Sequence, residues 1–218
     1  MPITKGLDKL VKYNNRSIKD LTTTPAAAGG GDTGAIVHIK TLTASSSANL
    51  SFVHGTDGVV LDSTYPIYKF EFINIHPAND DIGFFFNLSI DGGSNYNVTK
   101  TSTNFYAYHY ESDSAAALTY YAGGDLAQST GNQLLTGGTG NANDENICGE
   151  LSIYSPSSTT FVKHFMANIS STEADNRENN YYIAGYGNTT SAINAVRFLF
   201  ASGNIDSGKI KLYGIKDS

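Results

Sequence analysis

The sequence has no tryptophan, a single cysteine and only five prolines in 218 residues. One cysteine, Cys148, excludes an internal disulfide and any metal site built from clustered cysteines. No run approaches the roughly 18 apolar residues that a membrane-spanning helix needs. The opening residues are not followed by the apolar stretch of a secretory signal peptide. These absences predict a protein that is made in a cytoplasm and does not insert into a membrane.

Charged side chains are also scarce, at 16% of residues against about a quarter in an average protein. The chain instead contains 22 glycines and many serines, threonines and asparagines. Glycine costs an α-helix about 1 kcal/mol relative to alanine, and the small polar residues compete for its backbone hydrogen bonds. This composition predicts short strands joined by many turns, and therefore an all-β fold.

The few charges are unevenly distributed along the chain. The first twenty residues contain four lysines and one arginine against two aspartates. Since the whole chain has a net charge of −6, the remainder carries −9. An acidic body disfavours nucleic-acid binding, which needs lysine and arginine against the phosphates. The basic N-terminal segment is therefore predicted to serve for attachment.

Three parts are expected: an anchoring arm (1–24), a glycine-rich linker (25–34) and a β-sandwich body (35–218). Apolar residues of the arm recur near helical spacing, but Asn14-Asn15 interrupts them. A short amphipathic helix and an extended peptide lying on a neighbour therefore both remain open. Pro25, followed by alanines and glycines, is typical of a flexible linker. The residues predicted to form the anchor are Lys5, Leu7, Leu10, Val11, Lys12, Arg16, Ile18, Lys19 and Leu21.

From Ile36 onward, apolar residues alternate with period two, as in half-buried strands. In the clearest run, Phe84, Phe86, Leu88 and Ile90 are expected on one face. Ten short strands separated by turns predict an antiparallel β-sandwich, for which we expect a jelly-roll-like arrangement. The predicted strands lie at Ile36–Leu42, Leu50–His54, Tyr68–Phe72, Phe84–Ile90, Phe105–Tyr110, Leu118–Tyr121, Ile147–Tyr154, Phe161–Ile169, Ile193–Phe200 and Lys209–Ile215.

Three irregular features accompany these strands. The alternation at Tyr68–Phe72 breaks at Ile73, which predicts a β-bulge. Two long polar stretches, 123–145 and 170–180, are predicted to be surface loops, the first of them long enough to be functional.

The segment GNIDSGKI, residues 203–210, resembles a phosphate-binding loop in its glycine spacing. That loop needs serine or threonine after the lysine, and a helix after it. Here Ile210 follows Lys209, and the next residues alternate as a strand. We therefore expect the turn of a C-terminal hairpin and no nucleotide site.

No pattern supports a catalytic, cofactor or metal site. The five histidines lie singly, without the spacing of zinc ligands. No Gly-x-Ser-x-Gly motif is present, and Cys148 at the start of an apolar run is expected to be a small core residue. Glu145 and Glu150 would form a glycosidase pair only if folding brought them together. We accordingly expect no enzyme and no cofactor, and we assign no metal ligands. A calcium site remains open, because acidic pairs at Asp57/Asp62, Asp80/Asp81 and Asp144/Glu145 would contribute to one if folding brought further oxygen ligands beside them.

Tyrosine and phenylalanine are the more informative residues, with 14 and 11 copies. Tyrosine offers a large contact area with a polar tip, which suits protein interfaces and the stacking of sugars. Alternation puts Tyr106, Tyr108 and Tyr110 on one face of a strand, and Tyr181-Tyr182 lies near a predicted loop. These five are the candidate surface or interface aromatics, and partial burial in a sandwich is the alternative explanation.

Two phrases at the ends of the chain resemble known proteins. The opening ITKGLDKLVKYNNRSIKDLTTT is similar to the N-terminal anchors of virion proteins of tailed bacteriophages, which contain an Asn-Arg-Ser-Ile-Lys-Asp-like phrase. The ending INAVRFLFASGNIDSGKIKLYGIKD resembles the last hairpin of β-rich phage structural proteins. The resemblance covers 3–24 and 193–217. It implies a virion component that docks by its arm on tail or capsid and displays a β-sandwich body, commonly as a homotrimer.

The resemblance and the composition together favour a tail fibre or fibre-like protein. Its partners would be other virion proteins, and its outward loops would contact a host surface glycan. The alternative is a capsid decoration or cement protein that stabilises the head. A glycan-degrading enzyme and a free-standing lectin are further alternatives, the second disfavoured by the arm. The expected location is the virion, after synthesis in the host cytoplasm.

Overall fold

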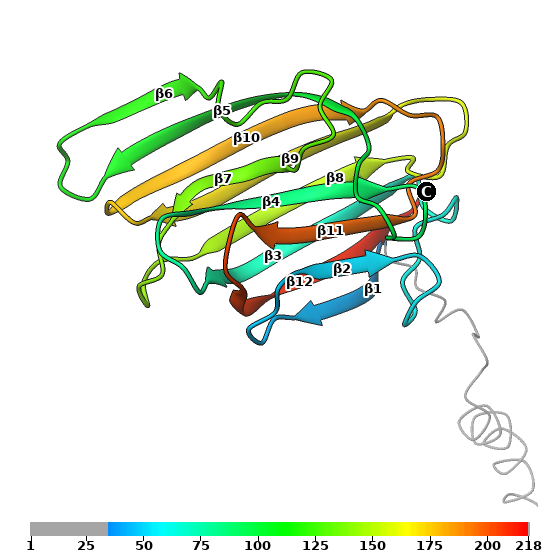
Figure 1. The fold of residues 1–218 in the computed structure, drawn as a ribbon, viewed down its shortest axis with the longest axis horizontal. Helices are drawn as coiled ribbons and strands as arrows, with labels where there is room; N and C mark the ends of the chain where they lie inside the picture. Colours follow the sequence, from blue (N-terminus) through cyan, green and yellow to red (C-terminus); the bar gives the residue numbers. More distant parts are fainter. Residues whose placement is uncertain (1–34, 218) are drawn as a thin grey trace, which may run out of the picture. The chain divides into compact units, whose positions relative to one another are not determined.

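The computed structural model describes residues 35–217, which form twelve β-strands and, within that range, no helix (Figure 1). Every strand pairing is antiparallel. The all-β class expected from the composition is confirmed. The predicted anchoring arm, residues 1–24, and the linker lie outside the described residues.

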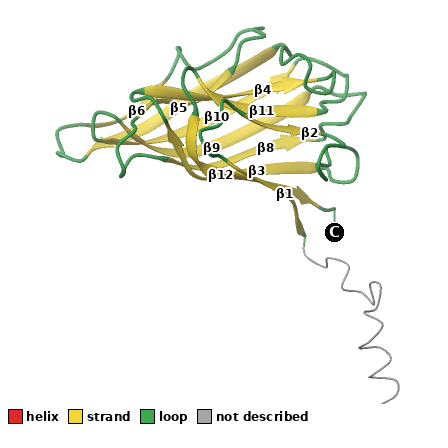
Figure 2. Cartoon of the chain, turned by 60° about the horizontal axis from the view of Figure 1, so that its bottom comes forward, coloured by secondary structure: helices red, strands yellow, loops and turns green. Residues whose placement is uncertain are grey.

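Eight of the strands form a jelly roll. One sheet has the order β1 (Ile36–Thr43), β12 (Ile205–Ile215), β3 (Ile67–Pro77) and β8 (Ile147–Tyr154). The other has the order β2 (Leu50–Val53), β11 (Ala195–Phe200), β4 (Ile82–Ser89) and β7 (Gln133–Thr139). Two Greek keys wound into two sheets produce this order, in which successive strands of the roll alternate between the sheets except at β4 and β7, which are neighbours in the second sheet. In Figure 2 the strands of the second sheet lie over those of the first.

Four more strands continue the first sheet beyond β8. They follow in the order β9 (Lys163–Glu173), β10 (Arg177–Gly187), β5 (Lys100–Tyr110) and β6 (Ala116–Tyr120). A single bridge, Thr139 with Glu173, joins β7 to the end of β9 and so links the two sheets at one corner. On the opposite side, Ser47 bridges to Ile205. The sandwich is thus nearly closed, which leaves few open strand edges.

Period-two alternation explains the inner and outer faces of the strands. Along β9, Phe165, Ala167 and Ile169 are buried, whereas Met166 and Asn168 between them are exposed. The inward residues of both sheets meet in one aromatic core. Phe198 on β11 lies at its centre, within 5.2–6.4 Å, centroid to centroid, of five other phenylalanine rings from β2, β3 and β4. This cluster holds the two sheets together.

The ten predicted strands are all present, nine of them with shifted ends, but two strands were missed. β7 lies in the stretch 123–145 and β10 overlaps the stretch 170–180, both predicted to be loops. The second stretch is a hairpin, because β9 continues to Glu173 and β10 begins at Arg177. Its many polar residues misled the prediction, since several of them face a polar pocket and not an apolar core.

The predictions for the burial of single residues were partly right, and the predicted β-bulge is present. Phe84, Phe86 and Leu88 are fully buried as expected, but Ile90 lies beyond β4 and is 42% exposed. Cys148 was expected in the core and is instead half-buried, with its thiol 3.4 Å from Asn74 Oδ1. The bulge expected at Ile73 is confirmed, because the β3–β8 register shifts between Phe72 and Ile75.

The segment GNIDSGKI is a turn and the start of a strand, but the hairpin predicted there is wrong, because β11 pairs with β2 and β4 whereas β12 pairs with β1 and β3 in the other sheet. Gly203 has φ 72° in the turn that precedes β12, and Gly208 has φ 113° where the β12–β3 register shifts. A Cβ atom on Gly208 would collide with the carbonyl oxygen of Asn74. The glycines therefore serve backbone geometry, which leaves no helix N-terminus for a phosphate.

Candidate functional site: a tyrosine-lined acidic pocket

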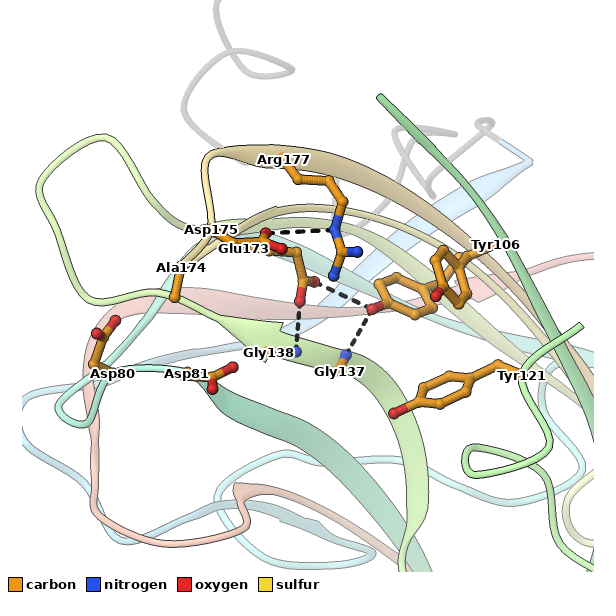
Figure 3. Close-up of a pocket in the computed structure, with 11 residues that line it drawn as sticks. Asp80, Asp81, Tyr106, Tyr121, Gly137, Gly138, Glu173, Ala174, Asp175 and Arg177 are labelled. Carbon is orange, nitrogen blue, oxygen red and sulfur yellow. Dashed lines mark hydrogen bonds and ion pairs between the residues drawn. The ribbon is translucent and has the colours of Figure 1, made fainter. Parts of the chain in front are cut away.

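A cavity lies at the corner of the body where the end of β9 approaches β7. β5, β9 and β10 are each 11 residues long, whereas β7, which faces them, has 7. The inner face near the ends of the long strands is therefore only partly covered, and Tyr108, Tyr110 and Arg177 there are half-buried. A cavity of about 540 Å³ occupies this corner (Figure 3). Its lining residues come from β5, β7, β9, β10 and from the connections β3–β4, β6–β7 and β9–β10: Asp80, Asp81, Tyr106, Tyr121, Gly137, Gly138, Glu173, Ala174, Asp175, Arg177 and Tyr181.

Glu173 lies at the floor of the cavity and is only 2% exposed. Its Oε2 accepts a hydrogen bond of 2.5 Å from the backbone N–H of Gly138, and its Oε1 accepts one of 3.2 Å from the Tyr181 hydroxyl. The pKa of Glu173 is raised, because burial disfavours the charged carboxylate more than these donors favour it. Glu173 therefore holds its proton to a higher pH than an exposed glutamate does.

Tyr181 is the second buried group of the floor. Its hydroxyl accepts hydrogen bonds from Gly137 N and Asn179 Nδ2, both at 2.9 Å, and donates to Glu173. Burial raises the pKa of Tyr181, and the nearby Glu173 carboxylate adds to the shift. The hydroxyl therefore stays protonated and acts as a fixed donor to the carboxylate.

Two glycines make room for the polar groups. A Cβ atom on Gly137 would lie 2.8 Å from the Tyr181 hydroxyl. A Cβ atom on Gly138 would lie 3.0 Å from Glu173 Oε2 and would collide with Asp81 Oδ1. The carboxylates of Asp81 and Glu173 thus converge over Gly138, one from the β3–β4 loop and one from the end of β9. Figure 3 shows both beside this glycine.

Tyrosine rings form one wall of the cavity. The ring of Tyr106 lies 5.1 Å from that of Tyr181 and 5.5 Å from that of Tyr121, centroid to centroid. The line continues along β5 through Tyr108 and Tyr110. Burial raises the pKa of Tyr121. The wall therefore offers neutral aromatic faces and hydroxyl groups to a ligand.

Arg177 closes the outer end of this wall. Its guanidinium lies 5.3 Å from the ring centroid of Tyr108 and 5.5 Å from that of Tyr110. Its Nε lies 3.4 Å from Asp175 Oδ1, and the Tyr110 hydroxyl donates to Asp175 Oδ2 at 3.0 Å. This hydrogen bond raises the pKa of Tyr110. Asp175 and the two tyrosine rings thus fix the guanidinium of Arg177 at the rim of the pocket. The other charged groups that line the pocket are carboxylates.

The structure brings some of the sequence-predicted residues together. Tyr106, Tyr108 and Tyr110 share the pocket face of β5, as alternation predicted, and Tyr181 joins them from β10. Tyr181 was expected near a loop at the surface, which is wrong, because it is buried in the middle of β10. Tyr182 faces the other side, where it is 41% exposed and stacks on Phe105. The predicted anchor residues, Lys5 to Leu21, lie outside the described residues.

Sequence reasoning missed the acidic half of the pocket. Glu173, Asp81 and Arg177 come from stretches predicted to be loops or turns. Hydrophobic alternation gave no signal for them, because the inward positions of β9 after Ile169 are the polar Ser171 and Glu173. The conditional pair of Glu145 and Glu150 finds no support. Glu145 is buried and accepts from Ala142 N at 2.6 Å, whereas Glu150 pairs with Lys69 on the outer face of the sheet.

Within residues 35–217, no cluster of three or more histidine, cysteine, aspartate or glutamate side chains is arranged to hold a metal ion. The same part of the chain has no helix of the length and apolarity that crossing a membrane requires.

The fold and the pocket define a class: a jelly-roll β-sandwich with an extended sheet and an aromatic, acidic cavity at one corner. Comparisons of the chain with protein-family models, with curated protein sequences and with solved structures found no match.

Proposed function

We propose that the chain is a virion attachment protein, of the tail-fibre type, whose jelly-roll body binds a host surface glycan through the tyrosine-lined pocket. The observation that carries this proposal is the union of a tyrosine wall with hydrogen-bonding carboxylates in one open cavity. Sugar rings stack on aromatic faces, and their hydroxyl groups donate to carboxylates. A fixed wall and floor suit such a ligand, because little side-chain entropy is lost on binding.

The assignment to a virion comes from the sequence. The basic arm, the glycine-rich linker and the phage-like phrases at both ends favour a part that is attached to a particle. A body with no disulfide is expected to gain durability from burial in an oligomer, which we take to be a homotrimer.

Removing one tyrosine ring from the wall tests the proposal that the pocket binds a glycan. We expect Tyr106→Ala to weaken binding to an array of bacterial capsule and O-antigen oligosaccharides by about tenfold, because one stacked ring is lost. Tyr182→Ala removes a tyrosine from the opposite face of the same sheet and should bind as the native protein does. Both proteins are first compared by thermal unfolding. Equal binding by the native protein and folded Tyr106→Ala would refute a glycan site in this pocket.

Deleting residues 1–24 tests the arm. The truncated protein is expected to be soluble, with the native β-sheet circular dichroism, because the described strands begin at Ile36. It should not be incorporated when virions are assembled with it in place of the full chain. Incorporation at the native level, measured by quantitative mass spectrometry of purified particles, would contradict the anchoring role.

Capsid decoration remains the second candidate, favoured by one surface. Five exposed apolar side chains lie on the outer face of β6, β5, β10 and β9: Phe105, Leu118, Tyr120, Met166 and Tyr182. Such a patch suits contact with a neighbouring protein. Immunogold labelling of particles separates the two candidates, because a fibre is labelled at the tail vertex and a decoration protein over all faces.

A further inference from the structure

We propose that the pocket selects a sugar that carries a free ammonium group, that is, an amino sugar that is not N-acetylated. This inference rests on the proposed glycan function and names the chemical class of the ligand. It depends on two features of the cavity, its uncompensated charge and its aromatic wall.

The charge of the cavity is negative and largely uncompensated. Four carboxyl groups line it, from Asp80, Asp81, Glu173 and Asp175, against one guanidinium, that of Arg177. Arg177 is engaged by Asp175 and by two tyrosine rings. Within residues 35–217 no lysine, arginine or histidine forms an ion pair with Asp80, Asp81 or Glu173. Carboxylates held together without a cation favour a ligand that brings one.

The aromatic wall also favours a ligand that carries a positive charge. The π-face of a tyrosine carries partial negative charge and attracts cations within about 6 Å of the ring centroid. Arg177 already makes this contact with Tyr108 and Tyr110 at the rim. The inner rings, Tyr106 and Tyr121, have no such cation among the described residues, and Figure 3 shows them at the other side of the pocket from Asp80 and Asp81. An ammonium group between them and Asp81 would gain both kinds of attraction.

The hydrogen-bonding capacity of the carboxylates agrees with this preference. Ionised carboxylates, such as those of Asp80 and Asp81 in the lining, accept hydrogen bonds and donate none. An ammonium group has three donors and no acceptor, whereas an N-acetyl group adds a carbonyl acceptor.

The test compares two probes that differ in this group. Titration calorimetry measures the full-length protein with a glucosamine tetramer and with the N-acetylglucosamine tetramer. We expect the glucosamine tetramer to bind at least about tenfold more tightly, the effect of one charge-assisted hydrogen bond. Asp81→Asn keeps the shape of the side chain and removes its charge, and it should erase most of this preference.

Asp57→Asn is the matched control. It removes one negative charge from an exposed loop outside the pocket, at φ 49°, which asparagine also tolerates. It should leave the preference unchanged. If Asp57→Asn and Asp81→Asn have equal effects, the attraction is only that of the net charge and the inference is wrong.

The remaining outcomes separate this inference from the proposed function. Equal affinity for the two tetramers, sensitive to Tyr106→Ala, would overturn the amino-sugar inference and leave glycan binding in place. If neither tetramer nor any oligosaccharide of the array binds, both are overturned.

Discussion

Replacing Phe198 by alanine is expected to lower the free energy of unfolding by about 3–5 kcal/mol, the usual range for a fully buried phenylalanine. Phe198 is 0% exposed, and its ring contacts phenylalanines of both sheets. Since Phe70 and Phe72 of the first sheet pack on it, the cavity would open between the two layers. The rigid strands on either side limit how far the cavity can collapse.

Urea unfolding followed by tyrosine fluorescence measures this loss. Domains of this kind have free energies of unfolding of about 5–15 kcal/mol, so the variant is expected to unfold at a much lower urea concentration. Phe161→Ala is the control, because Phe161 is 71% exposed and its loss should change stability by no more than about 0.5 kcal/mol. If Phe198→Ala costs no more than Phe161→Ala, the aromatic cluster does not hold the sheets together.

The second large effect concerns Lys100, a lysine with no exposed surface. Its ammonium group donates to Asn87 Oδ1 at 2.6 Å and to the Val98 carbonyl at 2.7 Å. Within the described range, no carboxylate forms an ion pair with it. Burial lowers the pKa of Lys100 to about 8, from 10.5. The difference between the two values corresponds to about 3 kcal/mol.

The sign of the pH dependence follows from proton binding. Between about pH 8 and pH 10.5, the unfolded chain keeps its proton on Lys100 while the folded protein releases it. Since the unfolded state then binds more protons, the free energy of unfolding rises with pH across this window. The destabilisation that comes from burying the charged ammonium group of Lys100 is fully present below pH 8. It is lost as the pH approaches 10.5.

Lys100→Met removes the titrating group and should flatten this rise by up to about 3 kcal/mol. The measurement is urea unfolding of both proteins at a series of pH values between neutral and 10. Lys209→Met, at an exposed position of β12, should keep the native slope. A Lys100→Met curve parallel to the native one would mean that Lys100 is not desolvated in the folded protein.

Much of the fold was predictable, because β-strand alternation is a local property. The run Phe84–Leu88 shows its inner face in the order of its residues, and the same rule put Tyr106, Tyr108 and Tyr110 on one face of β5. The turns at Gly203 and the bulge at Ile73 are also local, since they depend on the φ values that a few residues can adopt.

The missed strands show where this rule fails. β10 begins Arg-Glu-Asn-Asn, and its inward residues there are polar because they face the pocket and not the apolar core. Hydrophobic alternation detects only strands whose inner face meets a core. A strand that lines a polar cavity therefore resembles a loop in its sequence.

By itself, the sequence determined the all-β class, the approximate positions of ten strands, the acidic character of the body and the common face of three tyrosines. Only the tertiary structure decided that Asp81 and Glu173 meet over Gly138, that Tyr181 is buried beneath them and that Glu145 and Glu150 have separate partners. The physical reason is that strand formation depends on neighbours along the chain, whereas the pocket depends on which strands pair across the sandwich. That pairing, fixed by packing of the shared core, brings together carboxylates that lie far apart in the sequence.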